Sequence, residues 1–246
     1  MQNIYIGTSG YSYQYWKNRF YPASLPTSEW LSYYAILFDT LELNSTFYRF
    51  PRIENLKKTA ASVPSEFRFS VKAHKIITHS KRMSGAQDKV REFTGIVESG
   101  LKDKLACILY QLPPSYQYSE ARLHDILTSV EHSSRNVIEF RHISWWNETV
   151  FSSFRKHNLT FCNIGFSGLP DEEIITSGIF YKRMHGEPKL FESCYSEHQL
   201  QSLAYSINRK KETYVYFNNT MFEAGYSNAL RLKELIPQES CPGNKR

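Results

Sequence analysis

Val137-Ile-Glu-Phe-Arg141 is the stretch of the chain that decides the fold. Ile138 and Phe140 alternate with Glu139 and Arg141, which is the period of two that a β-strand requires. One face of this strand is apolar and suits packing against helices, whereas the other face is charged. In a closed barrel the charged face points inward and, at the end of the strand, into the mouth. The stretch therefore predicts a barrel strand with polar side chains at the mouth.

Similar short runs recur along the chain in alternation with longer segments. We expect strands at Ile4 to Thr8, Leu41 to Asn44, Arg68 to Ala73, Ala106 to Leu112, Val137 to Arg141, Thr160 to Ile164, Ile179 to His185 and Tyr214 to Asn219. Strands joined by long crossover segments pair in parallel. The 246 residues also match the ~250 that are typical of a single α/β barrel. The pattern predicts one (β/α)8 barrel of the TIM type, in the α/β class.

Several connecting segments have a helical period. Their predicted apolar faces are Trp30, Leu31, Tyr34, Ala35 and Phe38; Phe93, Ile96 and Val97; Leu123, Ile126, Leu127 and Val130; and Leu200, Leu203, Ala204 and Ile207. Ser196 and Gln199 predict a capping box at the start of the last of these helices. The exception is Gly165 to Gly178, which predicts an irregular loop where a crossover helix should lie. We expect one barrel domain over residues 1–236 and a polar tail over 237–246.

The composition favours a soluble, cytoplasmic protein. Hydrophobic residues make up 41% of the chain, which suffices for a sizeable core. No apolar stretch approaches the ~18 residues of a membrane span, and no signal-peptide pattern opens the chain. The four cysteines lack metal-ligand spacing. A net charge of +6 favours a small anionic ligand, with nucleic acid as the alternative partner; the sequence carries no signal for the oligomeric state.

Strand parity gathers polar side chains at the mouth. The candidates at inward or strand-end positions are Glu42, Asn44, Lys72, Gln111, Glu139, Arg141, Arg183, His185, Asn218 and Asn219. Buried charges need partners, so these groups either neutralise one another or meet a ligand. Because active sites of this fold lie at the carboxyl ends of the strands, the position favours a ligand site.

Four of these residues are candidates for catalysis. Glu42 and Glu139 fit the roles of general acid and base, provided that their surroundings separate their pKa values. The alternative is that both are permanent anions that orient neighbouring arginines. Lys72 could form a Schiff base if desolvation lowered its pKa, although two nearby glutamates favour its charged form. His185 completes the catalytic set.

The remaining candidates concern ligand binding. Arg141 and Arg183 form a predicted anion clamp, because each guanidinium can grip a carboxylate or phosphate; the alternative is a salt-bridge network that closes the barrel. We expect Arg183→Met to weaken anion binding and to leave the fold intact. Trp145 and Trp146 form a predicted stacking wall for a sugar or base, with packing of the loop on the barrel as the alternative.

No cofactor is predicted. The chain has neither a GxGxxG nor a Walker motif, so no nucleotide site of those kinds is expected. Glu42, Glu139 and His185 are available as ligands for a divalent metal, but no HxH or HExxH motif accompanies them. We assign no metal site, and a divalent metal remains a lesser alternative.

Longer motifs follow one another in order at the expected strand ends. They are Gly7-Thr-Ser-Gly-Tyr-Ser-Tyr13, Phe20-Tyr-Pro22, Leu41-Glu-Leu-Asn-Ser-Thr-Phe-Tyr48, Ile77-Thr-His79, Gln111-Leu-Pro-Pro114, Glu139-Phe-Arg-His142, Ser144-Trp-Trp146, Arg183-Met-His-Gly186 and Tyr216-Phe-Asn-Asn-Thr220. Together they resemble the YecE-like family, catalogued as domain of unknown function 72, over nearly the whole chain. The resemblance implies a TIM barrel and supplies no catalytic roles. One departure is the end of the sixth strand, Asn163-Ile-Gly-Phe166, where many members carry an acidic residue.

The leading hypothesis is an enzyme that acts by acid-base chemistry on a small anionic, phosphorylated or sugar-like substrate at the barrel mouth. The alternative is a nucleic-acid-binding or phosphodiesterase-like protein that uses a basic, aromatic-rimmed mouth. A third hypothesis is a scaffold whose mouth is plugged by its own side chains. A closed pocket would favour the first, and cations spread over a broad surface the second.

Overall fold

The computed structural model describes residues 3–207 and 212–236, so the predicted tail at 237–246 lies outside the described residues. Eight parallel strands form one sheet in the order β1-β8-β7-β6-β5-β4-β3-β2. They are β1 (Ile4–Thr8), β2 (Thr40–Leu43), β3 (Arg68–Lys72), β4 (Leu105–Gln111), β5 (Asn136–Glu139), β6 (Thr160–Gly165), β7 (Ile179–Met184) and β8 (Glu212–Phe217). Every predicted strand is confirmed, with ends shifted by two residues at most.

The sheet closes into a barrel between β1 and β2 through a short seam. Ser9 pairs with Glu42 in an isolated parallel bridge, and the N–H of Gly10 donates to the carbonyl of Glu42 at 2.9 Å. Gly7 permits the close approach of the two strands, because a Cβ at this position would lie 2.3 Å from the carbonyl oxygen of Thr40. The fold is therefore the predicted (β/α)8 barrel.

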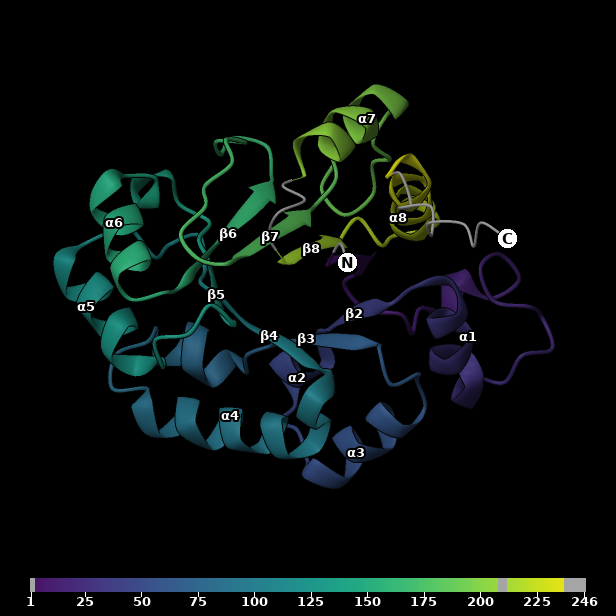
Figure 1. Ribbon diagram of the computed structural model, residues 1–246, viewed down its shortest axis with the longest axis horizontal. Coiled ribbons are helices and arrows are strands. Elements are labelled where there is room, and N and C mark those ends of the chain that lie inside the picture. Colours follow the sequence, from purple (N-terminus) through teal and green to yellow (C-terminus); the bar gives the residue numbers. More distant parts are fainter. Residues whose placement is uncertain (1–2, 208–211, 237–246) are drawn as a thin grey trace, which may run out of the picture.

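Helices surround the strands on the outside of the barrel (Figure 1). They are α1 (Trp30–Leu37), α2 (Ser45–Tyr48), α3 (Ile53–Ala61), α4 (Gln87–Leu101), α5 (Glu120–Ser129), α6 (Glu148–Lys156), α7 (Glu197–Ser206) and α8 (Ala224–Leu235). Short helical turns are η1 (Gln14–Trp16), η2 (Thr27–Glu29), the π-helical η3 (Ile76–Ser80), η4 (Lys102–Lys104) and η5 (Ile143–Trp145). Within the described ranges, none of the helices combines the length and the apolar character that crossing a membrane requires.

The predicted helical details hold where the sequence pattern was clear. The capping box of α7 is present, since the Ser196 side chain accepts from the backbone of Gln199 and the Gln199 side chain accepts in return from the backbone of Ser196. The chain after β6 forms turns and irregular loop over residues 166–178, without a helix. The Asn163 side chain holds this loop, because it exchanges two hydrogen bonds of 2.7 and 2.9 Å with the backbone of Ile174.

Apolar side chains form two clusters separated by the barrel wall. The outer cluster lies between strands and helices and includes Leu41, Phe69, Ile138 and Phe140. The inner cluster fills the barrel and consists of Ala106, Cys107, Leu109, Val137, Cys162, Ile164, Ile179, Tyr181, Tyr214 and Tyr216. The assignment of strand faces from parity is thus correct, and it places the inward polar residues above a packed apolar layer.

Candidate functional site

Arg183 is the centre of a buried charge network at the carboxyl ends of β2, β5 and β7. Its Nη1 donates to Glu139 at 2.5 Å and its Nη2 donates to Glu42 at 2.7 Å. The three side chains are at most 1% exposed. The hydroxyl of Tyr181 donates to the other oxygen of Glu42 at 2.7 Å. Burial opposes the charge on Arg183, but the two carboxylates raise the pKa of its guanidinium well above its ordinary value, so it stays a cation.

Glu139 is shared between two arginines. One of its oxygens accepts from Arg183 and the other accepts from Nε of Arg141, whose side chain is 8% exposed. Burial alone would raise the pKa of Glu139, but the charges of Arg141 and Arg183 hold it well below its usual range. Every carboxylate oxygen of Glu42 and Glu139 thus has a donor. This arrangement favours the predicted alternative, in which both glutamates are permanent anions that orient the arginines.

His185 is a buried acceptor that positions Arg141. Its Nε2 lies 3.0 Å from Nη2 of Arg141, and its Nδ1 lies 2.9 Å from the side-chain amide of Asn218. A guanidinium can only donate, so Nε2 must accept and the ring proton lies on Nδ1, which in turn requires the oxygen of the Asn218 amide to face the ring. Burial and the nearby arginines lower the pKa of His185 well below its ordinary value, so the ring is neutral.

Lys72 is the exception in this layer of charges. It ends β3 among the mouth residues, and among the described residues the contact of its ammonium is with an aromatic ring and not with a hydrogen-bond or ion-pair partner. The ring of Phe47 lies 4.5 Å from the ammonium and forms a cation-π contact. Burial, and to a lesser extent the charge of Arg183, lower the pKa of Lys72 from its ordinary 10.5 to about 8, against the opposing effect of Glu139 and Glu42.

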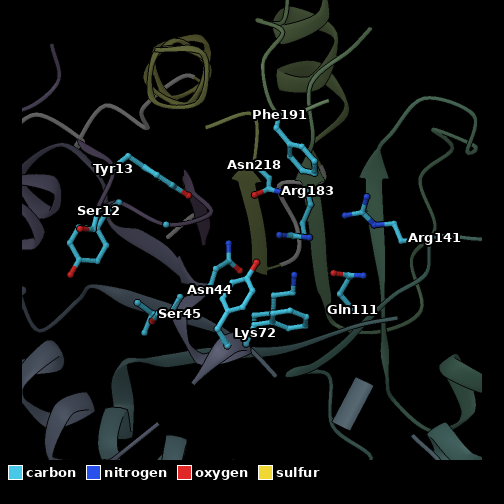
Figure 2. Close-up of a pocket in the computed structure, with 15 residues that line it drawn as sticks. Ser12, Tyr13, Asn44, Ser45, Lys72, Gln111, Arg141, Arg183, Phe191 and Asn218 are labelled. Atoms are coloured by element: carbon cyan, nitrogen blue, oxygen red, sulfur yellow. The ribbon is translucent and has the colours of Figure 1, made fainter. Parts of the chain in front are cut away.

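A cavity of about 470 Å³ opens above this layer and contains the end of Lys72 (Figure 2). Figure 2 shows the labelled side chains arriving from several strands and loops, with Lys72 between Asn44 and Gln111 and pointing toward the level of Arg183. The volume lies within the ~300–1,000 Å³ of small-molecule sites. The lining residues are Gly10, Tyr11, Ser12, Tyr13, Leu43, Asn44, Ser45, Phe47, Tyr48, Lys72, Gln111, Arg141, Arg183, Phe191 and Asn218. The mouth is therefore not plugged by its own side chains.

The predicted candidates fall into three groups. Six line the cavity, namely Asn44, Lys72, Gln111, Arg141, Arg183 and Asn218. Glu42, Glu139 and His185 lie buried beside them in the charge network. Trp145, Trp146 and Asn219 are not among the described residues that line the cavity.

The predicted stacking wall is wrong for Trp145. Its ring is fully buried on the outer side of β5, stacked on Phe140 and Tyr116, and its Nε1 donates to the backbone of Tyr116 at 2.6 Å. Trp146 is half-buried, packs edge-to-face on Phe161 and contacts both the outer and the inner cluster. The Trp145 indole therefore packs η5 against the barrel, which is the predicted alternative for this residue.

Asn219 is also placed away from the cavity. Because side chains alternate, Asn218 faces the mouth and Asn219 faces the opposite way. Its amide donates to the carbonyl of Ser193 at 2.9 Å and to the side chain of Asn228 at 3.0 Å, and its side chain is fully buried. It connects the end of β8 to α8 and to the loop before α7.

Aromatic residues of the mouth were not predicted by strand parity. Tyr13, Phe47, Tyr48 and Phe191 line the cavity from loops and from the short helix α2. Phe191 has a φ of 67°, in the left-handed region that bulky residues rarely adopt, and the residue is 41% exposed. The signal available in the sequence was the aromatic content of the motifs around residues 11–13 and 47–48, which gives no direction for a side chain.

The site does not have the donor set of a metal centre. Among the residues that the structure describes, no three His, Cys, Asp or Glu side chains lie where they could share a metal ion. The oxygens of Glu42 and Glu139 and Nε2 of His185 already accept from Arg141, Arg183 or Tyr181. The three groups considered as metal ligands thus have their lone pairs directed at cations and hydrogen-bond donors.

Comparison with known proteins supports the resemblance seen in the motifs. A family model described as "Protein of unknown function DUF72" matches residues 5–245. The UPF0759 protein YunF of Bacillus subtilis (strain 168) is 27% identical over 156 residues, which are 60% of this chain and 54% of that protein, so the match spans about half the length of this relative.

Two crystal structures share the architecture. A DUF72 family protein of Thermotoga maritima MSB8 superposes with a TM-score of 0.84 and 30% identity, covering 94% of this chain and 98% of that one. A DUF72 family protein of Enterococcus faecalis V583 has a TM-score of 0.77 at 16% identity, with 95% of each chain covered, and shows the fold alone. Because the family model and the Thermotoga structure both extend over nearly the whole chain, the protein belongs to the DUF72 family.

Proposed function

We propose that the protein is an enzyme that binds a small anionic compound in the mouth cavity and uses Lys72 to accept and return a proton. The observation that carries this proposal is the environment of Lys72, whose ammonium faces the cavity and contacts the Phe47 ring, without a carboxylate partner among the described residues. A pKa of about 8 keeps both of its protonation states populated near neutral pH, as a proton-transfer group requires.

This assignment moves the proton-transfer role from the glutamates to the lysine. Glu42 and Glu139 accept hydrogen bonds from arginines on both oxygens or from an arginine and a tyrosine. A carboxylate held this way can take up a proton only by giving up a buried ion pair, which costs several kcal/mol. Their role in the proposal is to fix Arg141 and Arg183 in position.

The charges support an anionic ligand. Two arginines and two glutamates neutralise one another in the buried layer, so a protonated Lys72 leaves the site with one surplus positive charge. Arg141 also lines the cavity and has donors beyond those directed to Glu139 and His185. A carboxylate or phosphate in the cavity would balance the charge and meet these donors.

The polar lining supports a hydroxyl-bearing compound. The amides of Asn44, Gln111 and Asn218 and the hydroxyls of Ser12 and Ser45 line the same cavity. The Oδ1 of Asn44 is buried and has no hydrogen-bond partner among the described residues. Together with the aromatic side chains of the mouth, these groups suit a small sugar-like molecule.

The test is calorimetric titration with sugar phosphates, carboxylates and inorganic phosphate. Wild type should bind members of this set, and Lys72→Met should weaken binding at least tenfold. Lys75→Met is the matched control, because Lys75 is an exposed lysine at the N-cap of η3, three positions further along the chain, and its loss changes the net charge equally. No binding to wild type, or equal binding to both variants, would contradict the proposal.

The nucleic-acid alternative has weaker support. Two of the three cations that line the cavity, Arg141 and Arg183, are already paired with carboxylates, and the third lies at the base of the cavity. Its distinguishing test is binding of a single-stranded oligonucleotide at increasing salt, since phosphate-backbone binding falls steeply with ionic strength.

A further inference from the structure

We propose that the compound bound at the mouth carries an aldehyde or ketone beside its anionic group, and that Lys72 forms a Schiff base with it. The inference rests on the proposed function, since the anion site is what would bring the carbonyl carbon to the amine. It names the substrate class as anionic carbonyl compounds and gives Lys72 a covalent role.

The geometry around Lys72 suits a nucleophile. Its side chain rises from the last residue of β3 into the cavity and is flanked by the Phe47 ring and by the amides of Asn44 and Gln111 (Figure 2). Carboxylates lie on the same layer, yet both direct their oxygens to other donors. A lysine that served as a structural cation would be expected to end on one of them.

The paired arginines contribute to the same chemistry. Burial disfavours the charged form of Lys72, and the positive charge of Arg183 lowers the pKa in the same direction, so the neutral amine is populated near neutral pH. Only the neutral amine has the lone pair that attacks a carbonyl carbon. The guanidinium of Arg183 thus stays charged and attracts the anion, whereas the amine of Lys72 loses its proton and can react.

The reaction balances without a further reagent. The ammonium releases one proton, and the free amine forms a C–N bond to the carbonyl carbon while the carbonyl oxygen gains a proton. The carbonyl oxygen takes its proton from the nitrogen as the C–N bond forms. The hydroxyl of the carbinolamine then takes up the proton that the ammonium released and leaves as water, while the nitrogen lone pair forms the C=N bond and the nitrogen keeps its last proton. The net change is ammonium plus carbonyl to protonated imine plus water, with no oxidation or reduction.

The experiment traps the imine with cyanoborohydride, which donates a hydride to the C=N bond and leaves a stable secondary amine. The full chain is incubated separately with pyruvate and with dihydroxyacetone phosphate, and each adduct is located by peptide mass mapping. The two probes distinguish a carboxylate from a phosphate as the anionic group. We expect one of them to label Lys72 at least tenfold faster than any other lysine.

Two variants sharpen the result. Lys72→Arg keeps the positive charge but offers no amine, so labelling should disappear, whereas the exposed-site control Lys75→Arg should label like wild type. Because the adduct is located in wild type itself, the test holds even where a variant folds poorly. Adducts spread over surface lysines, or no adduct with either probe, would overturn the inference.

A parallel titration separates this inference from the proposed function. L-Lactate and glycerol 3-phosphate resemble the two probes but lack the carbonyl group. If wild type binds one of them and no adduct forms, the anion site stands and the Schiff base is refuted. If neither they nor the probes bind, both proposals fail.

Discussion

Arg183 and Lys72 are two cations on the inner face of the same barrel, and they differ in their partners. Arg183 is fully buried and meets two carboxylates, whereas Lys72 meets an aromatic ring and the open cavity. A third buried cation, Lys182, lies on the outer face of β7 and pairs with Asp171 at 2.7 Å. Of the three cations that line the cavity, Arg141 and Arg183 are paired with buried carboxylates, and Lys72 has no carboxylate partner among the described residues.

The largest change in stability is expected when Arg183, the cation shared by two buried carboxylates, is replaced. Arg183→Met leaves Glu42 and Glu139 buried without their shared cation, so the free energy of unfolding should fall by about 3–5 kcal/mol. Urea denaturation at pH 7 measures it, with Arg183→Lys as the variant that retains the charge. The expectation that Arg183→Met would leave the fold intact is therefore revised. A wild-type denaturation curve for Arg183→Met would show that the network does not stabilise the barrel.

Replacing Lys72, which has no carboxylate partner among the described residues, should change the free energy of unfolding in the opposite direction. The folded-state pKa of Lys72 is about 8, below its ordinary 10.5, so below pH 8 the folded state bears the cost of the buried charge. Lys72→Met should therefore raise the free energy of unfolding at pH 7 by up to about 3 kcal/mol.

This gain has a defined pH window. Between pH 8 and 10.5 the unfolded chain binds more protons at Lys72 than the folded one, so wild type gains stability relative to the variant and the gap closes. Urea denaturation of wild type and Lys72→Met at pH 7 and pH 10 measures the difference in their free energies of unfolding. The other titrating groups are common to both proteins and do not contribute to this difference. A gap that stays constant with pH would mean that Lys72 has an ordinary pKa.

The hydrogen bond from Tyr181 tests a smaller part of the paired network. Tyr181→Phe removes the donor to Glu42 and should lower the free energy of unfolding by about 2 kcal/mol, because hydrogen bonds to charged groups are the stronger ones. Tyr216→Phe is the matched control, since within the described part of the chain its hydroxyl contacts the hydroxyls of Thr40 and Ser70 and no charged group. Equal losses in the two variants would show that the charge on Glu42 adds nothing.

The smallest change in stability is expected for Lys182, on the outer face of β7. Lys182→Met should change stability by less than about 1 kcal/mol, because Asp171 is 73% exposed and regains water when its partner is lost. Asp171→Asn should cost more, since it leaves the buried ammonium of Lys182 unpaired. Thermal melts of the two variants give the order, and the reverse order would refute this account.

Strand alternation was enough to predict the inner layer. Glu139 and Arg141 follow from parity within one strand, and Glu42 and Arg183 from parity within two others. The pairing among them could not be predicted, because it depends on the strand order around the barrel and on the stagger between β2, β5 and β7. The sequence therefore left the catalytic and structural roles of the glutamates undecided, and the contacts of Arg183 favour the structural one.

The directions of loop side chains could not be predicted from strand alternation. Trp145 follows Arg141 closely in the sequence but turns to the outer side of β5, where Phe140 and Tyr116 stack on it. Phe191 reaches the mouth through a left-handed backbone conformation that no periodicity indicates. Periodicity predicts side-chain direction only while the backbone is regular, and the rim of this mouth is built mainly from irregular segments.

The seam between β1 and β2 has a consequence for biosynthesis. The ladder of β1 is with β8, the last strand to leave the ribosome, while its link to β2 is the bridge between Ser9 and Glu42. The first strand to be made is thus among the last to be secured. Until β8 is made, β1 lacks its main ladder partner and leaves a strand edge unpaired, and unpaired edges of partly folded chains are prone to aggregate.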